Sequence, residues 1–278
     1  MPVIAMTQEM GSLAKDVALQ LADRMGLAVM RYEVVDRVAG EMNLPKSLVG
    51  RLRVGKAGFR ERMTTDQRSI AMYTADELFA LAEKGNVVLR GWGATALLRP
   101  VPHVVCVRIT RSLARRVEWV MEHLGTDDAA LAEAEVSRSD RARAARMNEQ
   151  FDVTWGDPLL YDLVLNTDRV SVDSCVEQIR LMTTRPEFAE TPGSHALLAN
   201  LALQARVRVA LKEDPATREI DVHIEADQGR VALDGIVATA EERARAGEVA
   251  AAVSGVAGVD NRLRLMTMPR LFPSTKQT

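Results

Sequence analysis

Short apolar runs alternate with longer segments of helical periodicity over the first two thirds of the chain. Residues 2–6 read as a buried strand, and from Ser12 apolar residues recur at helical spacing as far as Met25. The same alternation predicts further strands at 27–30, 86–90, 104–109 and 161–167, and helices at 34–42, 69–84, 127–148 and 172–182, with another through Arg115, Arg116 and Trp119. Strands that alternate with helices predict an α/β fold with a parallel sheet flanked by helices.

A change of composition marks the end of this pattern. Residues 186–196 contain two prolines and a glycine and show no periodicity, which predicts a linker. The pattern beyond it is helix, strand, strand, helix, strand, and Thr239 with Glu242 forms a capping box before the second helix. The expected organisation is therefore a domain at 1–185, a linker at 186–196, a small α+β domain at 197–268 and a tail at 269–278.

Composition narrows the class of protein and the compartment. Hydrophobic residues make up 47% and charged residues 27% of the 278 positions, as in globular proteins. A formal net charge of −2 argues against a general nucleic-acid binder. Cys106 and Cys175 lack C-x-x-C spacing and are expected to be buried free thiols. With no export signal and no apolar run near 18 residues, neither secretion nor a membrane span is expected, and the cytoplasm is the expected location.

The first strand, loop and helix form a unit that can present a helix N-terminus to a phosphate group. Unpaired N–H groups of the first turn and the helix dipole both favour an anion there. Gly11 allows a close backbone approach, Ser12 can cap the helix, and Lys15 can reach back to the same charge. An ordinary strand-to-helix connection with a capping serine would share this pattern.

The loop departs from the Walker A consensus. Anchored on Lys15, that motif would place glycine at positions 9 and 14 and a hydroxyl residue at 16, where the chain has Glu9, Ala14 and Asp16. The carboxylate of Asp16 could bind magnesium itself or repel a phosphate.

Two later segments are rich in basic residues. Residues 45–68 form either a solvated, mobile connection or a segment that closes over an anionic ligand; they contain Arg51, Arg53, Lys56, Arg60 and Arg62. The helix predicted at 127–148 carries four arginines with only Asp140 among them: Arg138, Arg141, Arg143 and Arg146. This helix is either simply exposed or faces a polyanion.

Several motifs together resemble a known family. They are GS at 11–12, GWGATALL at 91–98, RITRSLARRVEWV at 108–120, the Asp140–Arg143 cluster, and WGDPLLYDLVLNT at 155–167. With these motifs, residues 1–182 resemble the cytidylate kinase-like family, relatives of the P-loop nucleoside monophosphate kinases. Residues 198–266 resemble a BON domain through GRVALDGIV at 229–237, TAEER at 239–243 and VAGVDNRL at 256–263.

The first resemblance implies transfer of the ATP γ-phosphoryl group to a nucleoside monophosphate, with ATP and magnesium as cofactors. It implies a P-loop NTPase-like sheet and a lid carrying transition-state contacts. The implied catalytic residues are Lys15, Arg141 and Arg143. The implied phosphate-binding residues are Gly11, Ser12, Lys15 and Asp16, and Asp16 is also a possible magnesium ligand. The implied acceptor-binding residues are Arg115, Arg116 and Asp157.

Departures from the family leave a second hypothesis open. Relatives have a loop close to G-S-G-G-R, whereas this chain has Leu13, Ala14 and Lys15, and Trp92 stands where relatives carry arginine. The chain could therefore be a nucleotide sensor or scaffold without turnover that works through its BON module. That module implies contact with a phospholipid, a small ligand or a protein partner.

Overall fold

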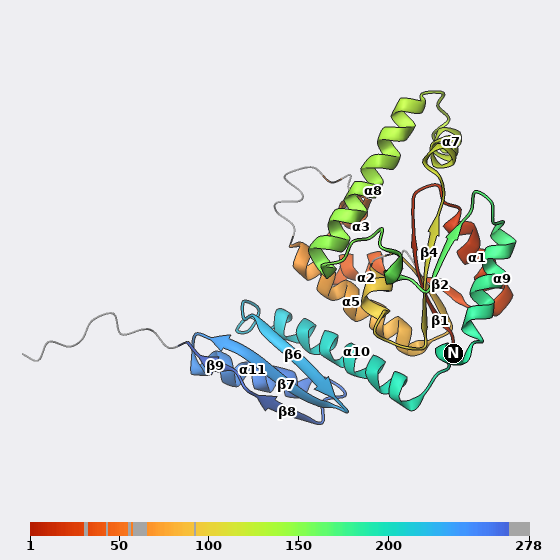
Figure 1. Ribbon diagram of the computed structural model, residues 1–278. Coiled ribbons are helices and arrows are strands. Elements are labelled where there is room, and N and C mark those ends of the chain that lie inside the picture. The colour runs from red at the N-terminus through yellow and green to blue at the C-terminus, as the bar shows by residue number, and fades with distance from the viewer. Residues whose placement is uncertain (31–32, 43, 55–56, 58–65, 92, 267–278) are drawn as a thin grey trace, which may run out of the picture. The chain divides into compact units, whose positions relative to one another are not determined.

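The computed structural model describes residues 1–30, 33–42, 44–54, 57, 66–91 and 93–266 (Figure 1). The chain divides into two compact units, Met1–Ala199 and Asn200–Thr278, and each is described by itself. Trp92, Lys56, Arg60, Arg62 and the expected tail at 269–278 lie outside the described residues. Within the described part, no helix has the length and apolar character needed to cross a bilayer.

The first unit is built on a parallel sheet of five strands. These are β1 (Val3–Gln8), β2 (Ala28–Met30), β3 (Val87–Arg90), β4 (Val104–Thr110) and β5 (Leu163–Asn166). Their order is β2-β3-β1-β4-β5, and every pairing is parallel. The predicted parallel sheet is confirmed. Because all strands point the same way, the segments that follow them meet at one border, here called the C-terminal edge.

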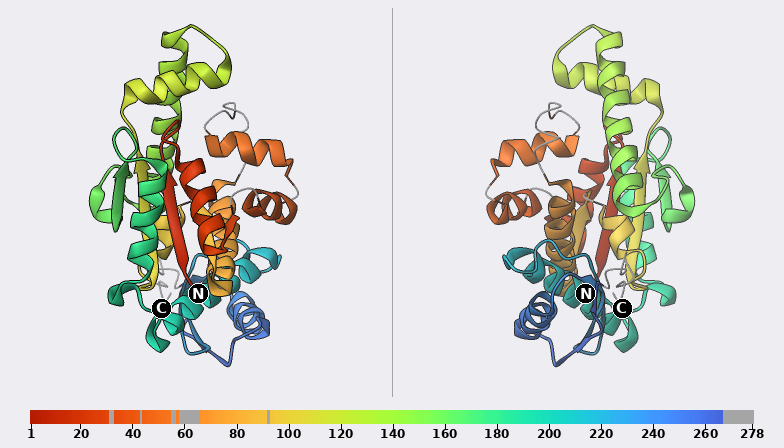
Figure 2. Two further views of the ribbon diagram at one scale, coloured as in Figure 1. Left: turned by 90° about the vertical axis from the view of Figure 1, so that its right-hand side faces the viewer. Right: turned by 90° about the vertical axis from the view of Figure 1, so that its left-hand side faces the viewer.

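Helices cover both faces of this sheet (Figures 1 and 2). On one face, α1 (Ala14–Met25) and α9 (Val172–Thr183) pack their apolar sides over Ile4, Met6 and Val107 in a fully buried core. The remaining helices before α9 are α2 (Glu33–Glu41), α3 (Lys46–Val54), α5 (Gln67–Lys84), α6 (Ala94–Leu98), α7 (Leu113–Leu124) and α8 (Ala129–Phe151). The helices α7 and α8 form a hairpin beyond the C-terminal edge (Figure 1).

Two connections are more ordered than their composition suggests. The first part of the basic stretch at 45–68 forms the helix α3. The segment expected as a linker contains the short 3-10 helix η2 (Pro186–Phe188) and the start of α10 (Pro192–Glu213), which begins five residues before the predicted helix at 197.

The second unit pairs two helices with a small mixed sheet. After α10 come β6 (Val222–Asp227), β7 (Arg230–Val237), α11 (Ala240–Ala252), β8 (Gly258–Asn261) and β9 (Arg264–Leu265). The strands β6 and β7 are antiparallel, whereas β8 and β9 run parallel to β7, so the last predicted strand is two short ones. The capping box of Thr239 and Glu242 is present, as predicted.

Candidate functional site

The loop between β1 and α1 leaves several backbone N–H groups available at the C-terminal edge. Gly11 has φ 77° and Leu13, the residue that caps α1, has φ 59°. The Ser12 hydroxyl does not cap the helix, because it donates a hydrogen bond to the Glu9 carbonyl at 2.8 Å. Within the described residues, the N–H groups of Leu13, Ala14 and Lys15 have no acceptor. Left-handed residues that alternate with right-handed ones turn successive N–H groups toward one point, which suits an anion.

The two residues that replace family glycines behave differently. The Ala14 side chain is 3% exposed and belongs to the core between α1 and the sheet, so its methyl group points away from the loop. Leu13 is half-buried and holds a left-handed conformation that costs a non-glycine residue about 1–2 kcal/mol. A side chain at Gly11 would be strained, since φ is 77° and a Cβ there would lie in tight contact, 3.1 Å from the Arg116 backbone. The strain therefore falls on Leu13.

A carboxylate at the start of the loop gathers donors from β4 and α7. Glu9 accepts hydrogen bonds from Arg108 at 2.7 Å, from the Thr110 hydroxyl at 2.7 Å and from the Arg111 N–H at 3.1 Å. Its second oxygen lies 3.6 Å from Nε of Arg116. The Glu9 and Arg108 side chains are only 11% and 10% exposed. This buried pairing fixes the loop against β4 and α7.

The arginines of α8 divide between the C-terminal edge and solvent. Arg143 donates to the carbonyl of Gln8, the last residue of β1, and its guanidinium lies 5.2 Å from the ring centre of Trp155. Arg141 is exposed, and its Nε bonds the Ser137 carbonyl of its own helix at 3.3 Å. Arg138 pairs with Glu135 at 2.6 Å. Burial lowers the pKa of the Arg146 guanidinium, an effect opposed by nearby Glu149. Of these four arginines, Arg143 therefore contacts the C-terminal edge of the sheet.

The three residues expected to bind the acceptor differ in their exposure and in their hydrogen-bond partners. Arg115 is 60% exposed and pairs with Glu118 at 3.0 Å on its own helix. Arg116 is buried and holds Asp140 of α8 through two hydrogen bonds, at 3.1 and 2.8 Å. Asp157 caps the short 3-10 helix η1 (Pro158–Leu160) by accepting from the Leu159 N–H at 2.9 Å. Arg116 is the member of this set that reaches the loop.

Lys15 and Asp16 begin α1 with exposed side chains. Within the described residues, no group of three or more His, Cys, Asp or Glu side chains could hold a metal ion. Magnesium in kinases commonly takes one or two carboxylates and completes its shell with phosphate oxygens and water. Asp16 offers one exposed carboxylate in the first turn of α1.

Sequence reasoning missed several residues that build the edge. Glu9, Arg108 and Asp168 were not singled out, although Arg108 lies in the otherwise apolar strand VVCVRIT. A charged residue in a buried strand needs a partner, and that is the signal that could have identified it. Asp168 accepts from the N–H and the hydroxyl of Ser112, at 3.0 and 3.1 Å, and so holds the residue that precedes α7.

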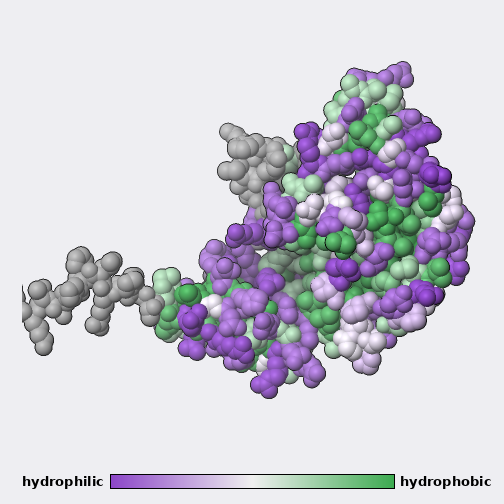
Figure 3. Space-filling model, viewed as in Figure 1, coloured by the Kyte–Doolittle hydropathy of each residue, from purple (hydrophilic) through white to green (hydrophobic). Residues whose placement is uncertain are grey.

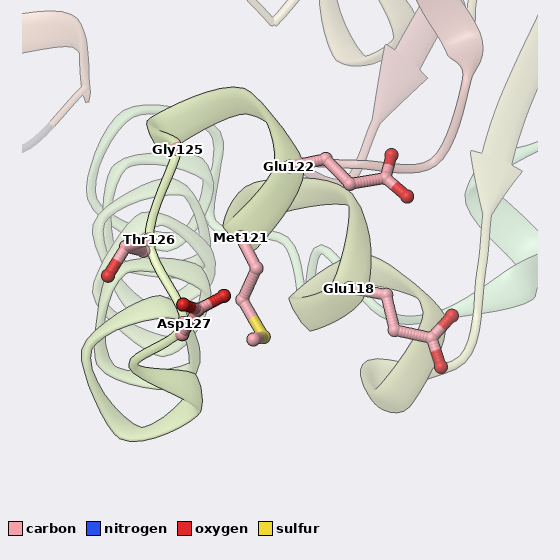
Figure 4. Close-up of a pocket in the computed structure, with 6 residues that line it drawn as sticks. All are labelled: Glu118, Met121, Glu122, Gly125, Thr126 and Asp127. Carbon is pink, nitrogen blue, oxygen red and sulfur yellow. The ribbon is translucent and has the colours of Figure 1, made fainter.

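A second feature of the hairpin is a groove of about 390 Å³ near its tip (Figure 4). Its lining residues are Glu118, Met121, Glu122, Gly125, Thr126 and Asp127. Apolar side chains also show among charged ones near this tip, where Leu124 and Leu131 are more than half exposed (Figure 3). Three carboxylates and no cationic side chain line the groove, so it does not suit a phosphate.

Two family models match the chain, one in each of its two units. Residues 3–169 match the model of the cytidylate kinase-like family, and residues 200–267 match the BON domain. None of the curated proteins matches the chain.

Several solved structures are similar to part of the chain. An uncharacterized protein from Eubacterium ventriosum is 22% identical with a TM-score of 0.53, and the match covers 66% of this chain and 100% of that one. A shikimate kinase from Bacteroides thetaiotaomicron is 14% identical with a TM-score of 0.42, over 65% of this chain and 97% of that one. A shikimate kinase from Acinetobacter baumannii in complex with shikimate is 12% identical with a TM-score of 0.41, over 66% and 92%.

The family model covers more than half of the chain, and the matched range includes β1 and the loop that follows it. The chain therefore belongs to the cytidylate kinase-like family and carries a C-terminal BON domain.

Proposed function

We propose that the first unit transfers the γ-phosphoryl group of ATP to a nucleoside monophosphate. The observation that carries this proposal is the meeting of two donor sets at the C-terminal edge. Among the described residues, the N–H groups of Leu13, Ala14 and Lys15 have no acceptor and follow β1, and Arg143 reaches the carbonyl of Gln8, the last residue of that strand. Phosphoryl transfer depends on positioning and on neutralising charge rather than on covalent chemistry by the protein. A cradle of N–H groups and guanidinium groups supplies both.

The proposal assigns the residue roles that the family resemblance implies. Gly11, Ser12 and Lys15 hold the phosphates of ATP, and Arg143 and Arg141 neutralise charge on the group in transfer. An oxygen of the acceptor phosphate attacks the γ-phosphorus in line, the bond to the β–γ bridging oxygen breaks, and ADP leaves. Arg143 donates to the carbonyl of Gln8, so its guanidinium lies at the end of β1, next to the loop that would hold the phosphates.

Acceptor binding is assigned to Arg115, Arg116 and Asp157 on the same proposal. Magnesium, when bound, would neutralise part of the phosphate charge, and Asp16 would hold it. We place the activity in the cytoplasm, where two buried free thiols are stable. The BON domain would bind a phospholipid, a small ligand or a protein partner.

A second candidate function is a nucleotide sensor or scaffold without turnover. Leu13 favours it, because a bulky residue holds a left-handed position where family members have glycine. Arg108 and Arg116 favour it too, since Glu9 and Asp140 already engage their guanidinium groups. In this case the BON domain would carry the protein's activity.

The two functions are separated by ADP release from ATP in the presence of CMP, UMP, AMP and GMP. Kinase activity predicts turnover with at least one acceptor, and a fall of about 10²- to 10³-fold in kcat for Lys15→Ala, the cost of removing a transition-state donor. Lys84→Ala changes an exposed lysine at the end of α5 and should leave turnover unchanged. ATP binding without turnover would support the sensor, and the absence of ATP binding would contradict both.

A further inference from the structure

Trp155 lies where β1, β4 and α8 approach one another. It follows the end of α8, is 6% exposed, and donates its indole N–H to the Thr7 hydroxyl at 3.1 Å. Thr7 pairs with Arg108 in the register of β1 and β4, so both side chains lie on one face of the sheet. The indole therefore spans two neighbouring strands just below the loop.

The carbonyl of Trp155 and its ring both contact arginine. The carbonyl accepts from Nη1 of Arg108 at 2.6 Å and from the Tyr161 hydroxyl at 2.7 Å. Cζ of Arg108 lies 4.2 Å from the ring centre, and Cζ of Arg143 lies 5.2 Å from it. Both distances are within the range of a cation–π interaction. Burial raises the pKa of Tyr161, although its bond to Arg108 opposes this, so its hydroxyl stays a donor at neutral pH.

A free arginine side chain samples many rotamers, and fixing it costs conformational entropy. The ring of Trp155 limits that freedom for Arg143, while the Gln8 carbonyl limits the direction of one N–H. A side chain held in this way before the ligand arrives loses less entropy on binding, which is the benefit of preorganisation.

We infer that Trp155 is a positioning residue that holds Arg143 at the C-terminal edge of the sheet before any nucleotide binds. It acts through the arginine and does not itself touch the phosphates. The inference deepens the proposed phosphoryl transfer and rests on it for its consequence in catalysis, but the placement of Arg143 is a property of the free protein.

The test uses phenylglyoxal modification of the full chain without nucleotide, followed by peptide mass spectrometry. The measured quantity is the modification rate of Arg143 divided by that of Arg141, which is exposed on the same helix and serves as an internal reference. Trp155→Leu removes the ring face, and Trp155→Phe keeps a smaller face without the N–H. Trp119→Phe is the matched control, since Trp119 stacks on His123 with ring centres 3.6 Å apart.

Trp155→Leu should raise the Arg143 to Arg141 ratio roughly two- to five-fold, the range that corresponds to losing one cation–π contact. Trp155→Phe should raise it less, and Trp119→Phe should leave it unchanged. If the leucine variant unfolds, every buried arginine will react, including Arg108, and the phenylalanine variant then decides. A ratio equal to wild type in a folded Trp155 variant would overturn the inference.

Steady-state kinetics provide a second readout when wild type turns over ATP. A positioning role predicts that Trp155→Phe lowers kcat several-fold and leaves the KM for ATP within about two-fold of wild type, because only the transition state needs Arg143 in place. A raised KM with unchanged kcat would overturn that role. If wild type shows no turnover, the proposed function fails, whereas the modification ratio still tests the placement of Arg143.

Discussion

The ion pair between Arg116 of α7 and Asp140 of α8 allows a direct test of how much a contact near the C-terminal edge stabilises the first unit. Arg116 holds Asp140 through two hydrogen bonds at 3.1 and 2.8 Å, and the two side chains are 8% and 27% exposed. We predict that Arg116→Met destabilises the first unit strongly. The methionine replaces part of the apolar stem, but it leaves Asp140 without its partner and removes one cation from Glu9.

The size of the effect follows from burial. Removing one partner of a buried ion pair costs about 3–5 kcal/mol, and because Asp140 is partly exposed and can be rehydrated we expect the lower end, about 3 kcal/mol. Glu9 keeps its bonds to Arg108 and Thr110 and so adds little. For a unit of this size, about 3 kcal/mol corresponds to a fall in Tm of roughly 6–12 °C.

Tryptophan fluorescence during urea unfolding measures this change. All three tryptophans, at positions 92, 119 and 155, lie in the first unit, so the signal follows that unit alone. Arg115→Ala is the matched control, because an exposed pair such as Arg115 and Glu118 contributes about 0.2–1 kcal/mol. A double-mutant cycle with Asp140→Asn should give a coupling of about 1.5–3 kcal/mol. An Arg116→Met effect no larger than that of Arg115→Ala would refute the reasoning.

Three further predictions concern other parts of the chain. Gly93→Ala should destabilise the first unit in the same fluorescence assay, because φ is 75° and a Cβ would lie 2.3 Å from the Phe151 ring. The double variant with Phe151→Ala should cost less than the sum of the two single variants, because the clash is then gone, and an unchanged Gly93→Ala variant would contradict the packing. Burial raises the pKa of Cys106 to about 12, so its thiol stays protonated at pH 8 and should react with a disulfide reagent only after denaturation; rapid labelling of the folded chain would disprove this. Thr239→Ala removes an acceptor from the Glu242 N–H and should cost about 1 kcal/mol, seen as faster amide hydrogen exchange in α11; equal exchange would count against the capping box.

Periodicity predicted most of the elements because it records which side chains are buried. The runs at 104–109 and 161–167 read as strands and became β4 and β5, and the capping box predicted the start of α11 to the residue. These features depend on residues close in sequence. Side-chain pattern and local hydrogen bonding fix them before any distant contact forms.

The arrangement of the candidate site could not be predicted from local sequence patterns. Arg108 and Trp155 are 47 positions apart, and nothing local shows that one will lie over the other. The sequence placed Ser12 as the cap of α1, but the cap is the next residue, Leu13, in a left-handed conformation, and the helix begins at Ala14. Leucine rarely adopts that conformation, so residue propensity alone could not have predicted it.

The central claim is that the loop after β1 binds the phosphates of ATP with its backbone N–H groups. The most direct measurement is a titration of the ¹⁵N-labelled chain with magnesium ATP, followed through the amide resonances of residues 10–16. The account predicts shifts that saturate and are largest at Gly11, Leu13 and Ala14, with smaller shifts in α11 of the BON domain. Saturable binding that leaves these amides unmoved, or no binding at millimolar ATP, would contradict it.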